Sequence, residues 1–185
     1  MFYDYAGLIP IRSLEDVNNI KFSDFQGSIP EGQQYIHMDA EVRWIPYYNF
    51  MSGKITKKGG AECDECCISM PNAYIELRFQ EDKSWYRGNL TPEQEAWLIR
   101  HERVHIEMAR RVHEQAQAKL RKLEKCGGCK KEVLVQLIDA LIKEGKEVVK
   151  EAEIEAQRQS NEYDRETLHS TNRDRQMEYN EQYGL

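Results

Sequence analysis

The sequence predicts an α+β protein in which an N-terminal antiparallel sheet region packs on a long helical hairpin. Apolar and polar side chains alternate over residues 35–44 and again over 73–79. This period of two is typical of strands with one buried face. Later, apolar side chains recur at steps of three and four over residues 97–112 and 134–152. That period indicates two amphipathic helices, and the short link between them predicts that they pair as a hairpin.

The chain has 185 residues, which is enough for one domain with a substantial core. We expect a single domain with three parts: a strand-rich part over residues 1–90, the helical hairpin over 91–159, and a tail over 160–185. Within the first part, the lysine- and glycine-rich stretch 52–60 is typical of a loop. The link at 126–129 between the helices is expected to be a tight turn, because it contains two glycines.

Charge and hydropathy exclude two classes of partner. The formal net charge of -6 argues against general nucleic-acid binding. No apolar run is long enough to span a bilayer, so we expect no membrane span. The first residues do not show the charged and then apolar segments of a signal peptide. The sequence leaves the oligomeric state open.

The first long helix has clear start signals. Thr91 can act as the N-cap, Pro92 suits the first helical position, and Gln94 completes a capping box. The periodic pattern then predicts a helix from Pro92 to about Leu123.

This helix carries the motif His101-Glu102-Arg103-Val104-His105, which has the form H-E-x-x-H. Residues four apart lie one turn above each other on the same face of a helix, so His101 and His105 can present two imidazoles to one cation. Both fall on the apolar stripe, where two polar rings cost free energy unless something binds both. The alternative is two buried histidines with ordinary hydrogen bonds. The spacing favours zinc, with Glu102 acting on a water rather than on the metal.

A catalytic zinc takes three protein ligands, and the third must come from another segment. The extended H-E-x-x-H-x-x-G-x-x-H pattern is absent, because Met108 and Arg111 stand at the glycine and final histidine positions. His113 lies two turns beyond His105 and is too far away. His169 is attractive, since neutral imidazole is a favoured zinc ligand. The full set of candidates is His169, Asp164, Glu162, Glu166, Glu151, Glu153 and Glu155.

The five cysteines form two clusters, Cys63-x-x-Cys66-Cys67 and Cys126-Gly127-Gly128-Cys129. Such clusters can build a four-thiolate zinc site, or they can form disulfides within each cluster or between the two. Disulfides between the clusters would staple the tip of the helical hairpin to the loop before a strand. The odd total leaves at least one thiol outside internal disulfides.

The segment Tyr163-Asp164-x-x-Thr167-x-His169, which follows the HERVH helix, resembles the signature of a bacterial family called domain of unknown function 922. Its members are described as secreted zinc-dependent proteases with a zincin-like fold. The strand at 38–44 before a cysteine-bearing loop, the paired long helices and the segment 176–179 fit the same layout, so the resemblance covers most of the chain.

The resemblance favours a zinc ligand set of His101, His105 and His169. Asp164 would then accept a hydrogen bond from a ligating imidazole and orient it; the rival interpretation makes Asp164 the third ligand. The resemblance also favours disulfides over a thiolate zinc site, and it implies a secreted or periplasmic location.

Together these observations predict a zinc-dependent metallopeptidase that acts on a peptide or protein substrate. Glu102 would take a proton from a zinc-activated water and pass it to the leaving amine. Tyr163 would donate its hydroxyl to the oxyanion, or else would be an aromatic core residue. A sheet edge at residues 73–80 would hold an extended peptide by strand addition. The sequence does not identify the bond that is cut.

Two other functions compete with this prediction. In the first, the chain is a catalytically inactive zinc-binding interaction module, in which the metal is a structural staple and the acidic tail and the hairpin bind a partner. In the second, the chain is a metal-free helical adaptor and the HERVH motif is a coincidence. Fold by itself does not decide between an enzyme and a module.

Overall fold

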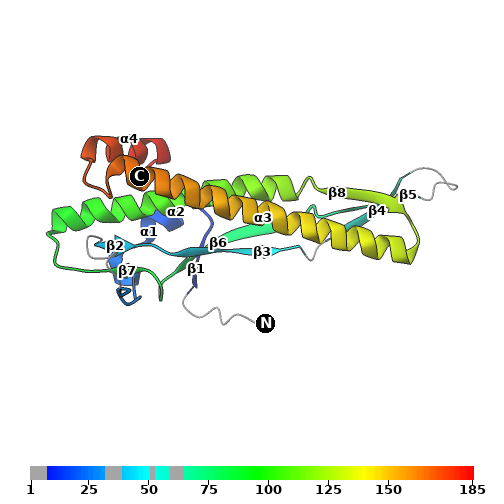
Figure 1. Ribbon diagram of the computed structural model, residues 1–185, viewed down its shortest axis with the longest axis horizontal. Helices are drawn as coiled ribbons and strands as arrows, with labels where there is room; N and C mark the ends of the chain where they lie inside the picture. The colour runs from blue at the N-terminus through cyan, green and yellow to red at the C-terminus, as the bar shows by residue number, and fades with distance from the viewer. Residues whose placement is uncertain (1–7, 32–38, 51–52, 59–64) are drawn as a thin grey trace. The chain divides into compact units, whose positions relative to one another are not determined.

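The computed structural model describes residues 8–31, 39–50, 53–58 and 65–185. The architecture is α+β, with antiparallel sheets and long helices, as the sequence predicts (Figure 1). The chain divides into two compact units. Unit one comprises residues 1–45, 76–111 and 156–185, and unit two comprises residues 46–75 and 112–155. The expectation of a single domain with three parts stays a prediction.

Within the described ranges, the strands form three small sheets. One sheet has the order β1-β6-β3, a second pairs β2 with β7, and a third has the order β4-β5-β8. The strands are β1 (Leu8–Ile11), β2 (Ala40–Glu41), β3 (Trp44–Asn49), β4 (Lys54–Lys58), β5 (Glu65–Ser69), β6 (Tyr74–Gln80), β7 (Trp85–Tyr86) and β8 (Glu124–Gly128).

Two of the helices are long. They are α2 (Pro92–Leu120) and α3 (Lys131–Thr167), and the shorter elements are α1 (Leu14–Asn19), the 3-10 helix η1 (Phe22–Asp24) and α4 (Arg173–Tyr183). The prediction of two long helices is confirmed, but α3 runs further than expected and includes the start of the predicted tail. None of the helices in the described ranges has the length and apolar character that a membrane span requires.

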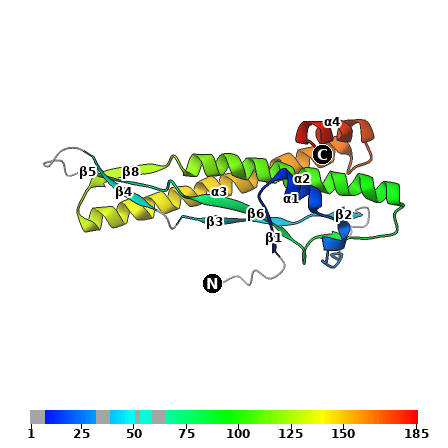
Figure 2. The ribbon, with the colours of Figure 1, turned by 180° about the vertical axis from the view of Figure 1, so that it is seen from behind.

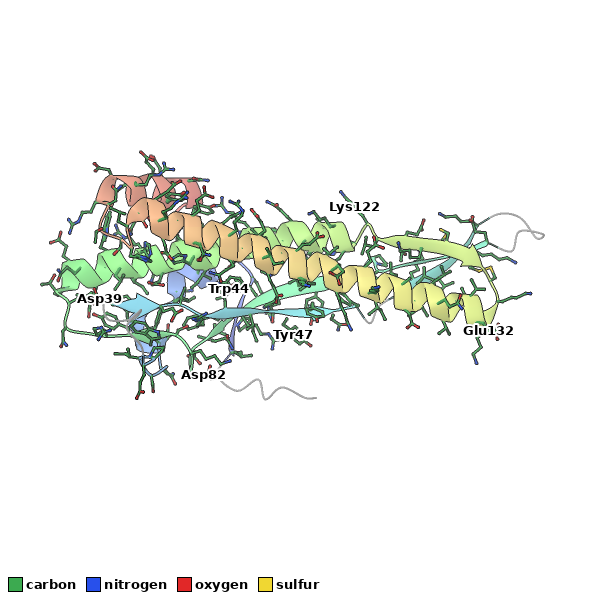
Figure 3. All side chains as sticks on the ribbon, viewed as in Figure 1. Asp39, Trp44, Tyr47, Asp82, Lys122 and Glu132 are labelled. Carbon is green, nitrogen blue, oxygen red and sulfur yellow. A yellow bond between two sulfur atoms is a disulfide. The ribbon has the colours of Figure 1, made fainter. Side chains whose placement is uncertain are left out.

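In unit one, the predicted strand at 35–44 is only partly regular. Residues 35–38 lie outside the described ranges, and the alternation is confirmed after them, since Ala40 and Val42 are buried and Arg43 is exposed. The strand is interrupted between β2 and β3 because side chains take its backbone donors. The Val42 amide donates to Glu102 Oε2 at 3.2 Å, and the Arg43 amide donates to Ser84 Oγ at 2.8 Å. Figure 3 labels Trp44 at the start of β3.

The expectation that residues 73–80 form a sheet edge is wrong. These residues form β6, which lies between β1 and β3. Leu77 and Phe79 are buried, as the alternation predicts, but Glu76 on the other face is buried as well. Its carboxylate accepts hydrogen bonds from Arg12 at 2.6 Å and from Arg78 at 2.9 Å. β6 therefore lies inside its sheet, and over Leu77–Gln80 the side that a peptide would need is already paired with β1.

In unit two, two segments predicted to be irregular are strands (Figure 2). The stretch 54–58 is β4, whose Ile55 pairs with Ile68 of β5. The link between the long helices is β8, whose Lys125 also pairs with Ile68, from the other side. Glycine and lysine favour loops locally, but hydrogen bonding to the apolar central strand β5 outweighs that preference.

Two disulfides join β5 to β8 and to the residue that follows β8, so disulfides are confirmed, and the structure chooses bonds between the two cysteine clusters where the sequence left the pairing open. They connect Cys66 to Cys129 and Cys67 to Cys126. Neighbouring residues of a strand point to opposite faces of the sheet, so Cys66 and Cys67 cannot turn both sulfurs toward one ion. This geometry explains why disulfides form in place of a four-thiolate zinc site. Cys63 lies outside the described ranges.

The core of unit two lies between its sheet and the helices. Ile68, Leu120, Leu141 and Val149 belong to one buried cluster, which brings α2 and α3 together as the predicted hairpin requires. Gly145 of α3 is buried here, and a β-carbon at this position would lie 3.3 Å from Met70 and from Phe50. Because glycine has no β-carbon, the side chains of Met70 and Phe50 can pack directly on the backbone of α3 at this position.

Removing one disulfide tests its contribution to stability. We expect the double variant Cys66→Ser, Cys129→Ser to unfold with a free energy less than about 2 kcal/mol below that of the parent chain, because the Cys67–Cys126 bond still closes almost the same loop in the unfolded chain. A reductant that opens both bonds should lower the free energy of unfolding by about 2–4 kcal/mol or more, because only then does the unfolded chain regain the entropy of a loop of 63 residues. Denaturant unfolding measures both differences, and an unfolding midpoint that the reductant leaves unchanged would contradict the assignment.

Candidate metal centre

The site is built on the first half of α2, within unit one. The predicted capping box is confirmed, since the Thr91 hydroxyl accepts from the Gln94 amide at 3.3 Å and the Gln94 side chain accepts from the Thr91 amide at 2.9 Å. The predicted inward stripe is also confirmed, because His101, Val104 and His105 are all buried. The capped helix therefore holds both histidines of the motif on its covered face.

Both imidazoles turn one nitrogen toward a carboxylate of α3. Asp164 Oδ1 lies 3.0 Å from His101 Nε2 and 3.0 Å from His105 Nε2. The two Nε2 atoms lie 3.2 Å apart. The three residues form one of the groups in the described ranges whose ligand atoms approach closely enough to hold a metal ion.

The spacing of these atoms fits zinc. Ligand atoms that each lie roughly 2.0–2.1 Å from one tetrahedral zinc are separated from one another by about 3.3 Å. The observed separations of 3.0 and 3.2 Å are close to that value. Two imidazoles and one carboxylate are also a ligand set that catalytic zinc uses. The residues present therefore fit a mononuclear zinc site, and they leave room in its coordination for a further ligand.

Charge at the site suits cation binding. Burial lowers the pKa of His101 to about 4, so its imidazole is neutral at pH 7. Burial also opposes the charge of Asp164, but the hydrogen bonds from His101 and His105 outweigh burial and hold the pKa of that carboxyl well below its usual range. For His105 burial again opposes the charge, while the Asp164 hydrogen bond and the nearby carboxylates raise its pKa. A metal ion that binds Nε2 of His105 therefore competes with a proton for that nitrogen.

Glu102 lies beside this group and outside it. Its side chain is buried, and one carboxylate oxygen accepts from the Val42 amide at 3.2 Å. Burial raises the pKa of Glu102 to about 7, and the imidazole of His105 opposes that rise. A carboxyl group with a pKa near neutrality can both take up and release a proton at physiological pH. This behaviour is what a general base requires.

Ser160 is a residue of the site that the sequence did not reveal. Its hydroxyl lies 2.6 Å from His105 Nδ1, on the side of the ring opposite Asp164. The tautomer that donates from Nδ1 to Ser160 keeps the Nε2 lone pair available for a cation. Ser160 stands one helical turn before Asp164 on α3, and this spacing of four was the available signal.

Tyr163 is fully buried, between the histidines and α4. Its ring stacks on His101 at 4.5 Å and meets His105 edge-on at 4.9 Å. It belongs to an apolar cluster with Val104, so its interpretation as an aromatic core residue agrees with its surroundings. Its hydroxyl has no hydrogen-bond partner among the described residues, and burial raises its pKa, so the group remains a potential donor. Its role at an oxyanion stays a prediction.

Helix α4 supports this arrangement from behind. Tyr179 meets Tyr163 edge-on at 4.7 Å and donates its hydroxyl to Glu166 at 2.9 Å. Arg175 also donates to Glu166, at 2.8 Å from Nε. These contacts tie α4 to the end of α3, and Figure 1 shows the two helices side by side. The rings of His101, Tyr163 and Tyr179 thus contact one another in a row. The ion pair between Arg175 and Glu166 holds the far end of this row in place.

His169 lies in the turn between α3 and α4, outside the group of three. Its side chain is 63 % exposed, and its Nδ1 lies 3.6 Å from Asp164 Oδ1. Leu168, His169 and Ser170 all have positive φ, between 50° and 72°, so this turn is left-handed. The indole of Trp97 donates to the Ser170 carbonyl at 3.0 Å and thereby holds the turn against α2. Ligation by His169 stays a prediction.

No family model matches this chain, and comparisons with curated proteins and with solved structures give no match either. The resemblance to domain of unknown function 922 and the zincin-like fold therefore stay predictions.

The third ligand can be tested by substitution. We expect Asp164→Ala to weaken zinc binding by more than about 100-fold, because losing a ligand costs more than losing a residue that only orients one. His169→Ala, the matched control in the adjoining turn, should change zinc affinity by less than about threefold. Competition with a chromophoric chelator measures both constants. Retention of zinc by Asp164→Ala together with its loss from His169→Ala would reverse the assignment.

Proposed function

We propose that this protein is a zinc-dependent hydrolase that cleaves peptide bonds, with His101, His105 and Asp164 as the metal ligands and Glu102 as the general base. The observation that carries the proposal is the approach of two Nε2 atoms and one carboxylate oxygen to within 3.2 Å of one another, directly beside a buried glutamate whose pKa is about 7. When bound, zinc would make a water nucleophilic near neutral pH and would polarise a carbonyl.

The residues of the chain have separate roles in this proposal. Glu102 would accept the proton of the attacking water and donate it to the leaving amine, because its carboxyl can exist in either state near pH 7. Ser160 would hold His105 in the tautomer that binds metal. The Val42 amide fixes one oxygen of Glu102, so the carboxylate keeps a single orientation. Tyr163 remains the candidate donor to the oxyanion.

A peptide substrate is supported by the motif rather than by a bound ligand. In H-E-x-x-H helices the glutamate next to the first histidine is the general base of peptide hydrolysis, and Glu102 holds that position. The two disulfides in unit two also favour an oxidising compartment, which agrees with a secreted or periplasmic protein.

Replacing Glu102 by Gln separates an enzyme from a zinc-binding interaction module. We expect Glu102→Gln to retain one zinc per chain, because Glu102 is not among the ligands, and to lose at least about 100-fold in peptide hydrolysis, as loss of a general base predicts. Metal content by plasma mass spectrometry and cleavage of an unstructured protein substrate measure the two effects. Glu93→Gln, in the exposed first turn of the same helix, is the matched control. Zinc binding in a wild type without hydrolytic activity would favour the module.

The pH dependence of hydrolysis follows from Glu102 and His105. Since the pKa of Glu102 is raised to about 7, the carboxylate needed as a base is lost as the pH falls. Protonation of His105 releases the metal in the same direction. We expect kcat/KM to rise with pH on an acid limb that ends near pH 7, or somewhat below it where zinc adds positive charge. A rate that rises as the pH is lowered from 7 to 5 would contradict these assignments.

A further inference from the structure

An apolar pocket of about 620 Å³ opens in unit two beside the strand β4. It is lined by residues 47–50, by Ile55 of β4, and by Ile138 and Ile142 of α3. Among the described lining residues, Asn49 alone has a side chain that is neither apolar nor aromatic. The volume is in the range of ligand sites in proteins. The pocket can therefore receive an apolar group from outside the chain.

Large apolar side chains are exposed around this pocket. Tyr48, Ile55 and Ile138 line it and are 40 %, 54 % and 38 % exposed. Val135, one turn before Ile138 on α3, is exposed as well. Scattered apolar side chains on a surface are ordinary, but a contiguous group beside a pocket marks an interaction site.

Beside the pocket, β4 has a free backbone edge. It pairs with β5 on one side, and no other strand in the described ranges pairs with it (Figure 2). The unpaired amide and carbonyl groups of an edge strand can hydrogen-bond to an added strand. The side chains of an added strand point to the same faces of the sheet as the residues opposite them. A residue opposite Ile55 would therefore point, like Ile55, toward the pocket.

The free edge of β4 is basic. Lys58 is paired with Glu124 at 2.7 Å, but no described residue forms an ion pair with Lys54 or Lys57. Because side chains alternate between the faces of a strand, Lys57 shares the face of Ile55 and Lys54 lies on the other face. An added strand thus meets one lysine on each face of the sheet.

The α3 wall of the pocket adds to this positive charge. Lys131 stands two turns before Ile138, and Lys146 stands one turn after Ile142, so both lysines continue the stripe that faces the pocket. The nearby carboxylate of Asp139 follows Ile138 directly and is turned away from that stripe, since consecutive residues of a helix do not share a face. The surroundings of the pocket therefore favour an acidic partner.

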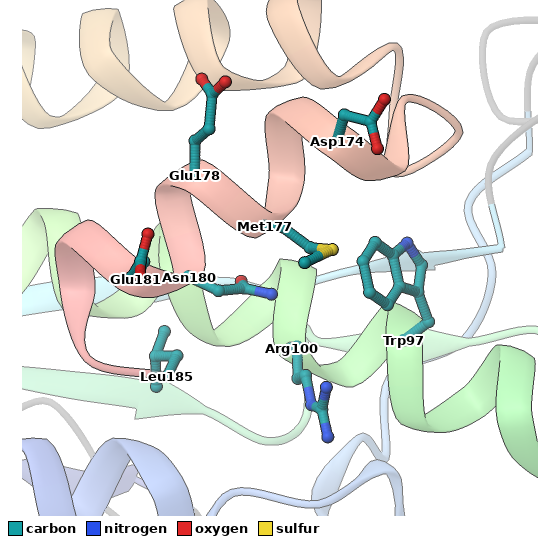
Figure 4. A pocket seen from close by; sticks show the side chains of 8 residues that line it. All are labelled: Trp97, Arg100, Asp174, Met177, Glu178, Asn180, Glu181 and Leu185. Carbon is teal, nitrogen blue, oxygen red and sulfur yellow. The ribbon is translucent and has the colours of Figure 1, made fainter.

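The pocket between α2 and α4 in unit one has no such preference (Figure 4). Its rim carries carboxylates such as Glu178, but Arg175 pairs with Glu178 and Arg173 lies over the ring of Trp97. Charges of both signs meet there, so its charge does not identify a ligand.

A second copy of the chain is a poor partner for β4. Antiparallel pairing of two copies centred on Thr56 would place Lys54 opposite Lys58, and a shift by one residue would place Lys54 opposite Lys57. Like charges directly opposite each other destabilise a pair of strands. The lysines thus oppose self-association and favour a strand that carries carboxylates.

We propose that β4 and the apolar pocket beside it form a docking site for an extended, acidic segment of another protein, which adds to β4 as an antiparallel strand. The partner residue opposite Ile55 places an apolar side chain in the pocket. A carboxylate two residues before it meets Lys57, and a carboxylate one residue after it meets Lys54. The site contains no residue of the candidate metal centre, so it does not depend on the proposed hydrolase function.

The test is peptide binding to the full-length Glu102→Gln protein, which keeps the probe intact. The probe is acetyl-Thr-Glu-Thr-Leu-Glu-Thr-amide. One control peptide has lysine in place of both glutamates, and the other has serine in place of leucine. Calorimetry measures the affinities, and the NMR signals of the Ile55 methyl groups report the place of binding.

We expect a saturable shift of the Ile55 signals and at least tenfold tighter binding of the probe than of either control peptide. Unmoved Ile55 signals at saturating probe, or equal affinities for the three peptides, would overturn the proposal. Phosphatidylserine vesicles that shift these signals where the probe does not would also overturn it, in favour of an anionic membrane surface.

Two variants at exposed positions test the contacts without disturbing the core. We expect Lys57→Glu to weaken binding of the probe at least tenfold and to prefer the lysine peptide, because complementary charge selects the partner. Ile55→Ser should weaken binding of the probe as well. Lys83→Glu, which reverses an exposed charge in unit one, is the matched control and should change nothing. Equal affinities in the parent and both β4 variants would refute the site.

Discussion

The structure around the candidate site depends on one constraint: two buried imidazoles on one face of α2 need a charged partner. His101 and His105 lie a turn apart in an apolar layer, where unpaired polar rings are costly. Asp164 of α3 supplies a carboxylate oxygen at 3.0 Å from each ring. This oxygen fixes how the two helices meet in unit one. It also creates the geometry that suits a divalent cation, so the same contact serves packing and chemistry.

Other features of unit one maintain that contact. Ser160 holds the far side of the His105 ring, and Tyr163 stacks on His101. Tyr179 presses on Tyr163 and is bound to Glu166, which Arg175 also contacts. A ligand constellation needs support of this kind, because affinity and reactivity depend on holding each ligand at its position. Helix α4 therefore supports the candidate site from outside the group of His101, His105 and Asp164.

Unit two is stabilised in a different way. Its sheet is small, with three strands, and an exposed strand such as β4 contributes little apolar burial. Two disulfides from adjacent cysteines of β5 join it to β8 on both faces of the sheet. Covalent links of this kind compensate for a limited core. The buried cluster of Ile68, Leu120, Leu141 and Val149 supplies the remaining apolar contacts. Unit two thus combines covalent bonds with packing, whereas the centre of unit one combines charge with aromatic stacking.

The sequence by itself determined the local features: the α+β class, the capped start of α2 at Pro92, and the inward stripe with both histidines. Each follows from interactions between residues a few positions apart. Only the tertiary structure decided that Asp164, 63 residues after His101, approaches both rings. It alone showed that β6 is central and that Cys66 pairs with Cys129. These outcomes depend on long-range packing, in which several carboxylates, histidines and cysteines compete for the same neighbour and periodicity gives no preference among them.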